Sequence, residues 1–477
     1  MNIDESGPRA RGRVITYSAP EGTPASEDFA LSVNGESVFV HQARVSAVPV
    51  NQVWPGYQRP LEQTEIASFA SFDFEGTVTI VVETREAVDS VVVRPLSYEI
   101  VPEVGDNRLT FKLSRPCQVV VEVNGRHGAL HLFANPQESD QPDPDDPKVR
   151  YFGPGVHHAG IIELRDGESA YLAGGAIVHG VITATDACDI RITGRGILDA
   201  SGFGRTDGPQ MIALLGCRDV KIEGIILRDP HVWTVVPALC SGVHINNIKL
   251  IGLWRYNADG IDLVNSRDVI IENCFVRAFD DNIVLKGFEL WHGRPTEMAP
   301  LHDIIVRHCV LWNDWGRALE IGAETRSTAI HDIVFADCDI IHFVHRAMDI
   351  QNGDRALVYD VLFENIRVEE AIVEGEFRED IAEYVSDPSQ VGLLLELIVA
   401  ANAYSKDTAR GAIHDITFRK VTAQGERWPM SRLEGYDAEH PVRRILFENL
   451  VIQGQPIESL EEGRMLTNPY VEEIAFA

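Results

Sequence analysis

The chain has 477 residues, of which 45% are hydrophobic and 24% charged, ordinary proportions for a globular protein. Its formal net charge of −30 disfavours nucleic acid and anionic membrane surfaces as partners, because both would repel it. No run of about 18 apolar residues occurs, so the sequence predicts no membrane-spanning helix.

Targeting and metal signals are absent from the sequence. The first residues contain no apolar signal core, so we expect a cytoplasmic protein, or a secreted one if the chain has been trimmed. The seven cysteines form an odd, widely spaced set without a Cys-x-x-Cys pair, and the histidines lack metal-ligand spacing. We therefore predict no disulfide framework, no metal site and no cofactor. The sequence does not fix the oligomeric state.

The N-terminal part has the pattern of antiparallel strands. Residues 77–83 and 118–123 are runs rich in β-branched residues, and turn signals such as Asn124-Gly125 separate such runs. This pattern predicts a small β-sandwich over residues 1–135. The Pro- and Asp-rich stretch 136–149 predicts a linker.

From residue 150 onward, one short phrase recurs: a polar residue or glycine, an apolar residue, any residue, and another apolar residue. It begins at Asp189, Asp219, Gly242, Asp268, Asp303, Asp332, Asp360, Asp415 and Arg444. The starts lie 23 to 35 residues apart, except for one gap of 55. One repeat cannot bury its own apolar face, but stacked repeats form a continuous core. The sequence therefore predicts an all-β chain whose residues 150–477 form a right-handed parallel β-helix.

Two further features of the repeats lead to predictions. The gap of 55 fits two coils, one of which carries an insertion at about residues 370–410, and the apolar run 393–404 within it predicts a helix. Cys274, Cys309 and Cys338 occupy the same place in successive repeats, so we expect reduced, buried thiols stacked in the interior.

Acidic residues occur together on two consecutive repeats. Asp259 lies in the segment Asn257-Ala-Asp-Gly-Ile-Asp262, and the pair Asp280-Asp281 follows 21 positions later, about one coil further on. Residues one coil apart lie above one another, so the three carboxylates would gather on one patch. Such groups share a proton, hold a metal or cut a glycosidic bond. Adjacent strand residues point to opposite faces, so both Asp280 and Asp281 reach the patch only if the backbone bends.

These segments resemble the glycoside hydrolase family 28 (polygalacturonase) superfamily. Its Asn-Thr-Asp motif matches Asn257-Ala258-Asp259, its Gly-Asp-Asp matches Phe279-Asp280-Asp281, and its following lysine matches Lys286. The resemblance covers roughly residues 150 to 370. It implies a right-handed parallel β-helix and an inverting hydrolase of carbohydrates. It further implies that Asp280 is the general acid and that Asp259 and Asp281 activate the water.

The departures from the family pattern concern the substrate. Gly316 stands in place of a histidine, with Arg317 beside it, and Asp349-Ile-Gln351 replaces an Arg-Ile-Lys that holds a uronate carboxylate in the family. An anion at this place would repel a uronate, whereas Asp and Gln suit sugar hydroxyls. A neutral sugar is therefore the expected substrate, as in the related dextranase and isopullulanase family. The expected substrate-binding residues are Asn257, Lys286, Arg317, Glu320, Asp349, Gln351 and Trp233.

Three alternatives to this hypothesis remain open at the level of sequence. The first is a polygalacturonase or exo-galacturonidase with the same carboxylates. The second is a polysaccharide lyase on the same fold, with calcium on carboxylates and Arg317 as the base. The third is a solenoid that binds sugars without cleaving them, which would not need the Asp280-Asp281 pair.

Overall fold

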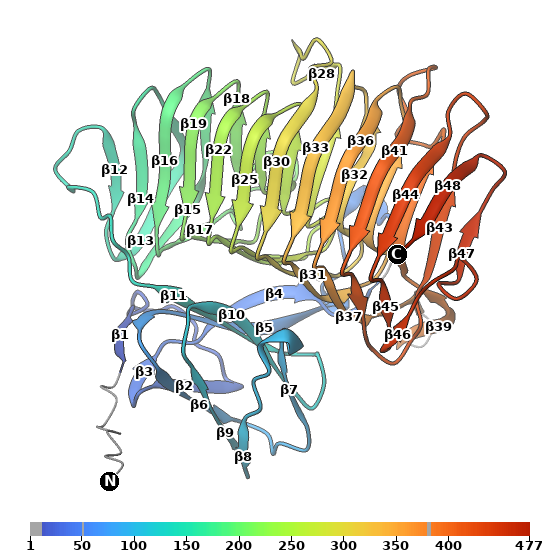
Figure 1. The fold of residues 1–477 in the computed structure, drawn as a ribbon. Helices are drawn as coiled ribbons and strands as arrows, with labels where there is room; N and C mark the ends of the chain where they lie inside the picture. Colours follow the sequence, from blue (N-terminus) through green and yellow to red (C-terminus); the bar gives the residue numbers. More distant parts are fainter. Residues whose placement is uncertain (1–11, 50–51, 379–382) are drawn as a thin grey trace, which may run out of the picture. The chain divides into compact units, whose positions relative to one another are not determined.

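The computed structural model describes residues 12–49, 52–378 and 383–477, and within these the chain is built almost wholly from strands (Figure 1). Two compact units divide it. The first comprises the described residues up to Ala43 together with Ile66–Pro142, and the second comprises Arg44–Glu65 with Asp143–Ala477. The predicted boundaries differ from this division, because residues 44–65 fall with the C-terminal unit rather than with the N-terminal one.

The first unit is a β-sandwich, as predicted. One sheet contains β1 (Arg13–Thr16), β4 (His41–Ser46), β5 (Thr64–Glu75), β7 (Val91–Arg94), β10 (Cys117–Val123) and β11 (Leu130–Pro136). The other contains β2 (Phe29–Val33), β3 (Glu36–Val38), β6 (Val78–Thr84), β8 (Glu103–Gly105) and β9 (Arg108–Leu113). Strand β5 pairs with β11 in parallel, whereas β1–β5, β7–β10, β10–β11, β2–β3, β2–β6, β6–β9 and β8–β9 pair antiparallel. Alternating side chains of both sheets form its core.

The second unit is a parallel β-helix with up to three strands in each coil, which confirms the predicted fold class. The first strands of the coils form one parallel sheet of 12 strands in chain order. These are β12 (Val149–Phe152), β14 (Ser169–Leu172), β16 (Cys188–Gly194), β19 (Arg218–Glu223), β22 (Ser241–Asn246), β25 (Arg267–Glu272), β30 (Leu301–Arg307), β33 (Ala329–Ala336), β36 (Leu357–Glu364), β41 (Ala412–Arg419), β44 (Val442–Glu448) and β48 (Val471–Phe476). Each of the nine recurring phrases lies in one of these strands.

The polar residue that opens each phrase has a backbone reason. All nine of these positions have a positive φ, between 52° and 65°. L-residues avoid this left-handed region, and Asp, Asn and Gly tolerate it best. The recurring residue, usually aspartate, therefore marks a backbone kink in nine of the first strands.

The second and third strands of the coils belong to one 21-stranded sheet. It contains β13 (Gly155–Leu164), β15 (Ala176–Thr185), β17 (Ile197–Asp199), β18 (Ile212–Leu215), β20 (Ile226–Arg228), β21 (Val235–Ala238), β23 (Lys249–Leu253), β24 (Ile261–Val264), β26 (Phe275–Ala278), β27 (Ile283–Gly287), β31 (Val310–Asn313), β32 (Arg317–Thr325), β34 (Asp339–Phe343), β35 (Arg346–Asn352), β37 (Arg367–Ala371), β40 (Leu393–Val399), β42 (Thr422–Ala423), β43 (Met430–Glu434), β45 (Val451–Ile452), β46 (Gln455–Pro456) and β47 (Met465–Thr467). Inward side chains from the sheets form one continuous apolar core. Cys274, Cys309 and Cys338 lie in it as buried free thiols.

Two predictions about residues 370–410 are wrong. The run expected to be a helix forms β40, which pairs in parallel with β35, because a short apolar run suits a buried strand as well as a helix. The gap of 55 residues is one coil and not two, since β36 pairs directly with β41. The extra length is an antiparallel hairpin of β38 (Val373–Arg378) and β39 (Glu383–Val391) together with the loop after β40.

Residues 44–49 and 52–65, here called the strap, pack on the coil that carries β26 and β27. Trp54 has only 3% of its surface exposed and contacts Phe279 and Tyr256, with ring centroids 5.5 and 6.3 Å away. Arg59 lies over Phe279 at 4.4 Å and donates hydrogen bonds to strap atoms. The strap also carries the short 3-10 turns η1 (Pro55–Tyr57) and η2 (Leu61–Gln63).

Among the described residues, no helix has the length and hydropathy needed to cross a bilayer.

Candidate active site

The predicted carboxylates lie where the chain turns from the second strand of a coil into the third. Asp280 and Asp281 are in the turn between β26 and β27, and Asp259 is in the equivalent turn between β23 and β24. Because Asp280 and Asp281 are outside a regular strand, both can face the same side. The register of β24 with β27 places the two turns on adjacent coils.

One cavity of about 280 Å³ brings these residues together. It is lined by Trp233, Asn257, Asp259, Asp280, Asp281, Lys286, Trp315, Arg317, Glu320, Ala323, Glu324, His345 and Tyr404. All three predicted catalytic residues are in this lining, with five of the seven predicted substrate-binding residues. Asp349 and Gln351 are not.

Asp281 is surrounded by donors and cations. The Arg317 backbone N–H donates to Asp281 Oδ1 at 3.2 Å, and Lys286 Nζ donates to Asp281 Oδ2 at 3.3 Å. Burial alone would raise the pKa of Asp281, but Lys286 and Arg317 outweigh it and keep the pKa below its usual value. Asp281 is therefore an ionised carboxylate at neutral pH.

Asp280 has the opposite electrostatic position. Burial and the charge of Asp281 raise the pKa of Asp280 to about 7. The amide of Asn257 donates to Asp280 Oδ2 at 3.2 Å, while Asn313 Nδ2 donates to the Asp280 carbonyl at 2.7 Å and fixes the turn. The two neighbouring carboxyls thus differ in protonation near neutrality, which is the difference required between an acid and a base.

Asp259 has an acidic neighbour that sequence reasoning did not assign to the site. Asp262 has no exposed surface, and no donor in the described part of the chain reaches either of its carboxylate oxygens. Burial raises the pKa of both groups well above the usual value, and the proximity of Asp262 raises that of Asp259 further. A proton shared between the carboxyls of Asp259 and Asp262 removes the repulsion between two buried negative charges. The sequence signal for Asp262 was its place in the segment 257–262.

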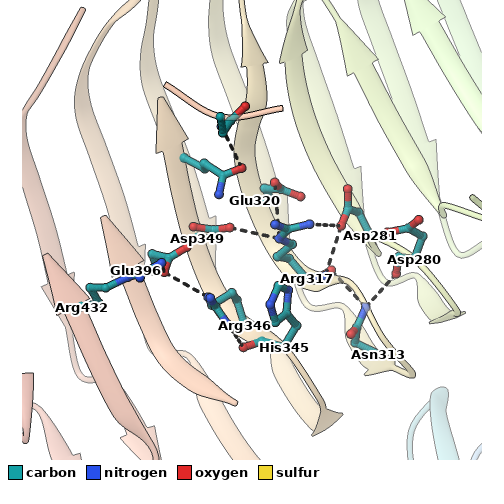
Figure 2. A network of polar contacts seen from close by, with 12 residues as sticks. Asp280, Asp281, Asn313, Arg317, Glu320, His345, Arg346, Asp349, Glu396 and Arg432 are labelled. Atoms are coloured by element: carbon teal, nitrogen blue, oxygen red, sulfur yellow. Dashed lines mark hydrogen bonds and ion pairs between the residues drawn. The ribbon is translucent and has the colours of Figure 1, made fainter. Parts of the chain in front are cut away.

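Charged side chains continue from the cavity along the third strands of the next coils (Figure 2). The register aligns Glu320 of β32 with Asp349 of β35 and Glu396 of β40. Arg317 lies between Asp281 and Asp349, with nitrogen–oxygen distances of 3.8 and 3.3 Å, and Arg346 pairs with Glu396 at 3.2 Å. These buried pairs stiffen the row of coils beside the cavity.

The expectation that Asp349 and Gln351 meet sugar hydroxyls is not matched by their positions. Asp349 has no exposed surface and pairs with Arg317, and Gln351 Oε1 accepts a hydrogen bond of 3.4 Å from Asn402. Sequence spacing could not reveal this, because the arginine that pairs with Asp349 comes from the preceding coil. Asp349 therefore forms an ion pair with Arg317 and does not itself line the cavity.

Glu320 lines the cavity but is fully buried. Burial and then Asp281 raise the pKa of Glu320 well above its usual value, which favours the protonated side chain. Arg317 lies 3.8 Å from it. Glu320 is thus a neutral donor beside the ionised Asp281.

Gly316 stands where the family pattern has a histidine, and a different histidine, His345, lines the cavity. A Cβ on Gly316 would lie 2.5 Å from the carbonyl carbon of Asp280 and 2.6 Å from Asp281 Oδ1, so no side chain fits there. His345, in the turn between β34 and β35, reaches the cavity instead, and burial and Arg317 lower its pKa well below the usual value. Its signal was missed because it lies one coil later than the family position.

Lys286 and Trp233 also line the cavity. Lys286 Nζ lies 3.5 Å from Glu324 and 5.1 Å from the Trp233 ring centroid. Trp233 stacks on Trp291 of the short hairpin β28 (Leu290–Trp291) and β29 (Arg294–Pro295), with centroids 5.6 Å apart. Glu324 and Tyr404 had no motif that could have singled them out.

Among the described residues, no set of three or more His, Cys, Asp or Glu side chains is arranged to hold a metal ion. What the cavity offers chemically is an ionised carboxylate, Asp281, beside a carboxyl that titrates near neutrality, Asp280.

Known proteins resemble this chain in sequence and in fold. Residues 178–375 match the family model of glycosyl hydrolases family 28, which confirms the resemblance predicted from the motifs. No curated protein sequence is significantly similar to the chain.

Solved structures share the fold at low sequence identity. Dex49A from Penicillium minioluteum has a TM-score of 0.66 and 14% identity, over 97% of this chain and 96% of its own. A hyperthermoactive exopolygalacturonase from Thermotoga maritima has a TM-score of 0.51 and 17% identity, over 68% of this chain and 82% of its own.

Proposed function

We propose that this protein, a glycoside hydrolase of the family 28 type, cleaves glycosidic bonds with inversion, with Asp280 as the acid and Asp281 as the base. The observation that carries the proposal is that two adjacent carboxyls face one cavity, where burial and Asp281 raise the pKa of Asp280 to about 7 while Lys286 and Arg317 hold the pKa of Asp281 below its usual value. Glycoside hydrolysis needs one protonated and one ionised carboxyl beside the same bond.

Each proton has a place in this mechanism. Protonated Asp280 donates to the leaving glycosidic oxygen as the bond to the anomeric carbon breaks. Ionised Asp281 accepts a proton from the water that attacks this carbon from the opposite face. Lys286 and Arg317 favour the ionised form of Asp281 before the reaction.

Asp259 takes a narrower role than the family resemblance implies. Because burial and Asp262 raise the pKa of Asp259 well above its usual value, Asp259 is less suited than Asp281 to accept a proton. We assign it to orienting the water or a sugar hydroxyl, while Asp281 alone accepts the proton.

A neutral sugar is the proposed substrate. The two cations in the cavity lining are both engaged: Lys286 contacts Asp281 and Glu324, and Arg317 contacts Asp281 and Asp349. A uronate carboxylate would compete with these buried partners and would meet the ionised Asp281. Neutral hydroxyls avoid that cost, and the indole of Trp233 suits the apolar face of a sugar ring.

Galacturonides are the second candidate. Lys286 and Arg317 are cations in the cavity lining, and one similar structure is an exopolygalacturonase. This candidate requires that the substrate carboxylate displaces one of the acidic partners from a cation.

A panel of neutral oligosaccharides and oligogalacturonides, followed by product chromatography and ultraviolet absorbance, tests the proposal. We expect saturated products from a neutral oligosaccharide. Cleavage of galacturonides alone would contradict the substrate assignment and keep the hydrolase. An unsaturated, ultraviolet-absorbing product that disappears with a chelator would replace hydrolysis by a lyase reaction.

A further inference from the structure

An arginine outside the predicted site contacts the residue that touches the general acid. Arg205 lies in the loop after β17 and is half-buried. Its Nη1 donates to the carbonyl of Tyr256 at 2.7 Å, and its Nη2 donates to Asn257 Oδ1. Asn257 Nδ2 in turn donates to Asp280 Oδ2.

This arrangement fixes the direction of the Asn257 amide. An asparagine amide can turn over, presenting either its oxygen or its nitrogen to a neighbour. A guanidinium has only hydrogen-bond donors, so it can bond to the amide oxygen of Asn257 but not to its NH₂ group. With Oδ1 taken by Arg205, the NH₂ group is the part that faces Asp280. The positive φ of Asn257, 53°, is a conformation that asparagine tolerates.

Arg205 itself is held from several sides. Its guanidinium lies 4.6 Å from the ring centroid of Tyr57 in the strap and 5.1 Å from that of Tyr256. The two rings lie 5.0 Å apart. Arg255 donates to the carbonyls of Ser201 and Phe203, which ties down the loop that carries Arg205.

We propose that Arg205 is a positioning residue for the general acid: supported by Tyr57 of the strap, it keeps the Asn257 NH₂ group directed at Asp280. The inference rests on the proposed role of Asp280. It extends the site to the loop after β17 and to the strap.

The groups around Asp280 determine in which direction its pKa changes when the hydrogen bond from Asn257 is lost. The carboxyls of Asp281 and Asp259 and the phenols of Tyr256 and Tyr404 face it, together with the cations Lys286 and Arg317. A hydrogen bond donated by Asn257 favours the charged form of Asp280 and opposes the rise in its pKa. Losing that donor therefore raises the pKa of Asp280 further.

The test compares Arg205→Met, Asn257→Ala and the double variant. On the substrate identified by the panel, Arg205→Met should lower kcat by roughly 10- to 100-fold with little change in KM, because it disturbs orientation rather than binding. The alkaline limb of the pH profile should move to higher pH. Arg205→Lys, which keeps a charged donor, should restore most of the activity. Arg191→Met, on the exposed Arg191–Asp189 pair, is the control for losing an arginine.

Carboxyl NMR of labelled aspartate, with Asp280→Asn for assignment, supplies a readout that needs no turnover. The pKa of Asp280 should rise equally in Arg205→Met, in Asn257→Ala and in the double variant, because both residues act through one hydrogen bond. Additive shifts, or an unchanged pKa in Arg205→Met, would overturn the inference. Absence of hydrolysis with the expected NMR shifts would reject the proposed function while supporting the positioning role.

Discussion

Two groups of aspartates in this solenoid differ in their surroundings. Those at the kinks of the first strands have a positive φ, and two of them, Asp303 and Asp332, have more than half of their side chains exposed. Those in the turns before the third strands, Asp259, Asp280 and Asp281, are buried together around one cavity. The first group lies at backbone kinks, and the second group is the one that we propose for catalysis.

The contrast teaches that position within a coil decides what an aspartate does. An exposed carboxylate at a kink is solvated whatever its neighbours are, so its charge costs little. A buried carboxyl keeps its proton unless cations stabilise the anion, as Lys286 and Arg317 do for Asp281. Aspartates therefore occupy backbone kinks in the first strands, whereas in the turns before the third strands they form the proposed acid–base pair.

Replacing the proposed acid should have the largest effect. Asp280→Asn removes the donated proton while keeping the shape of the side chain, so kcat should fall by roughly 10²- to 10⁴-fold. Steady-state kinetics with circular dichroism as a folding control measure this. Near-normal turnover in a folded variant would remove Asp280 from the mechanism.

Gly316 tests how tightly the acidic pair is packed. Gly316→Ala should displace the Asp280-Asp281 turn, since the new methyl group overlaps its backbone, and should lower kcat by about 10²-fold. Gly202→Ala is the matched control, because a Cβ there meets nothing within 4 Å. Equal activities of the two variants would contradict the close packing described for this turn.

The stability of the fold should reveal the raised pKa of Asp280. Burial and Asp281 raise its pKa from the usual range of an aspartate to about 7, so the folded state holds the proton more tightly than the unfolded chain and loses stability as the pH rises between these two values. Asp280→Asn should therefore be more stable than wild type at pH 8, on the order of a few kcal/mol, and equally stable at pH 4. Denaturant unfolding at both pH values measures it. A difference that does not grow with pH would contradict the shift.

Glu320 should tolerate a neutral replacement. Because this buried residue already carries a proton, Glu320→Gln should lower kcat by less than about 10-fold, whereas Glu320→Leu, which has no donor for Asp281, should lower it more. Kinetics of the two variants in parallel decide this. A loss in Glu320→Gln as large as in Asp280→Asn would mean that Glu320 reacts as an anion.

The smallest effect is expected in the exposed row. Asp303→Asn keeps a residue that tolerates the left-handed conformation, so its free energy of unfolding should change by less than about 0.5 kcal/mol, with activity intact. A large loss of activity in Asp303→Asn would contradict the distinction between the exposed aspartates of the first strands and the buried aspartates of the cavity.

The sequence patterns were sufficient to predict those features of the fold and the site that repeat from coil to coil. The period-2 phrases placed nine strands of the first sheet, and the 21-residue offset placed Asp259 beside Asp280 and Asp281. Both depend on residues close in sequence or exactly one coil apart, so their spatial relation follows from the fold.

Features that depend on distant partners could not be predicted. Ser46 lies 231 residues before Arg277, whose guanidinium donates to its carbonyl, so no spacing could have assigned the strap to the solenoid. Likewise, Asp349 was expected at the substrate because its partner Arg317 lies in another coil. The helix predicted for residues 393–404 failed because burial on both faces removes the alternation that distinguishes strands.

The most direct test of the central claim is the anomeric configuration of the first-formed product, followed by proton NMR on the purified protein and its cleaved substrate. The account predicts an inverted product, since Asp281 activates water opposite the leaving group that Asp280 protonates. A retained configuration would require a covalent intermediate and would contradict the assignment of Asp280 and Asp281.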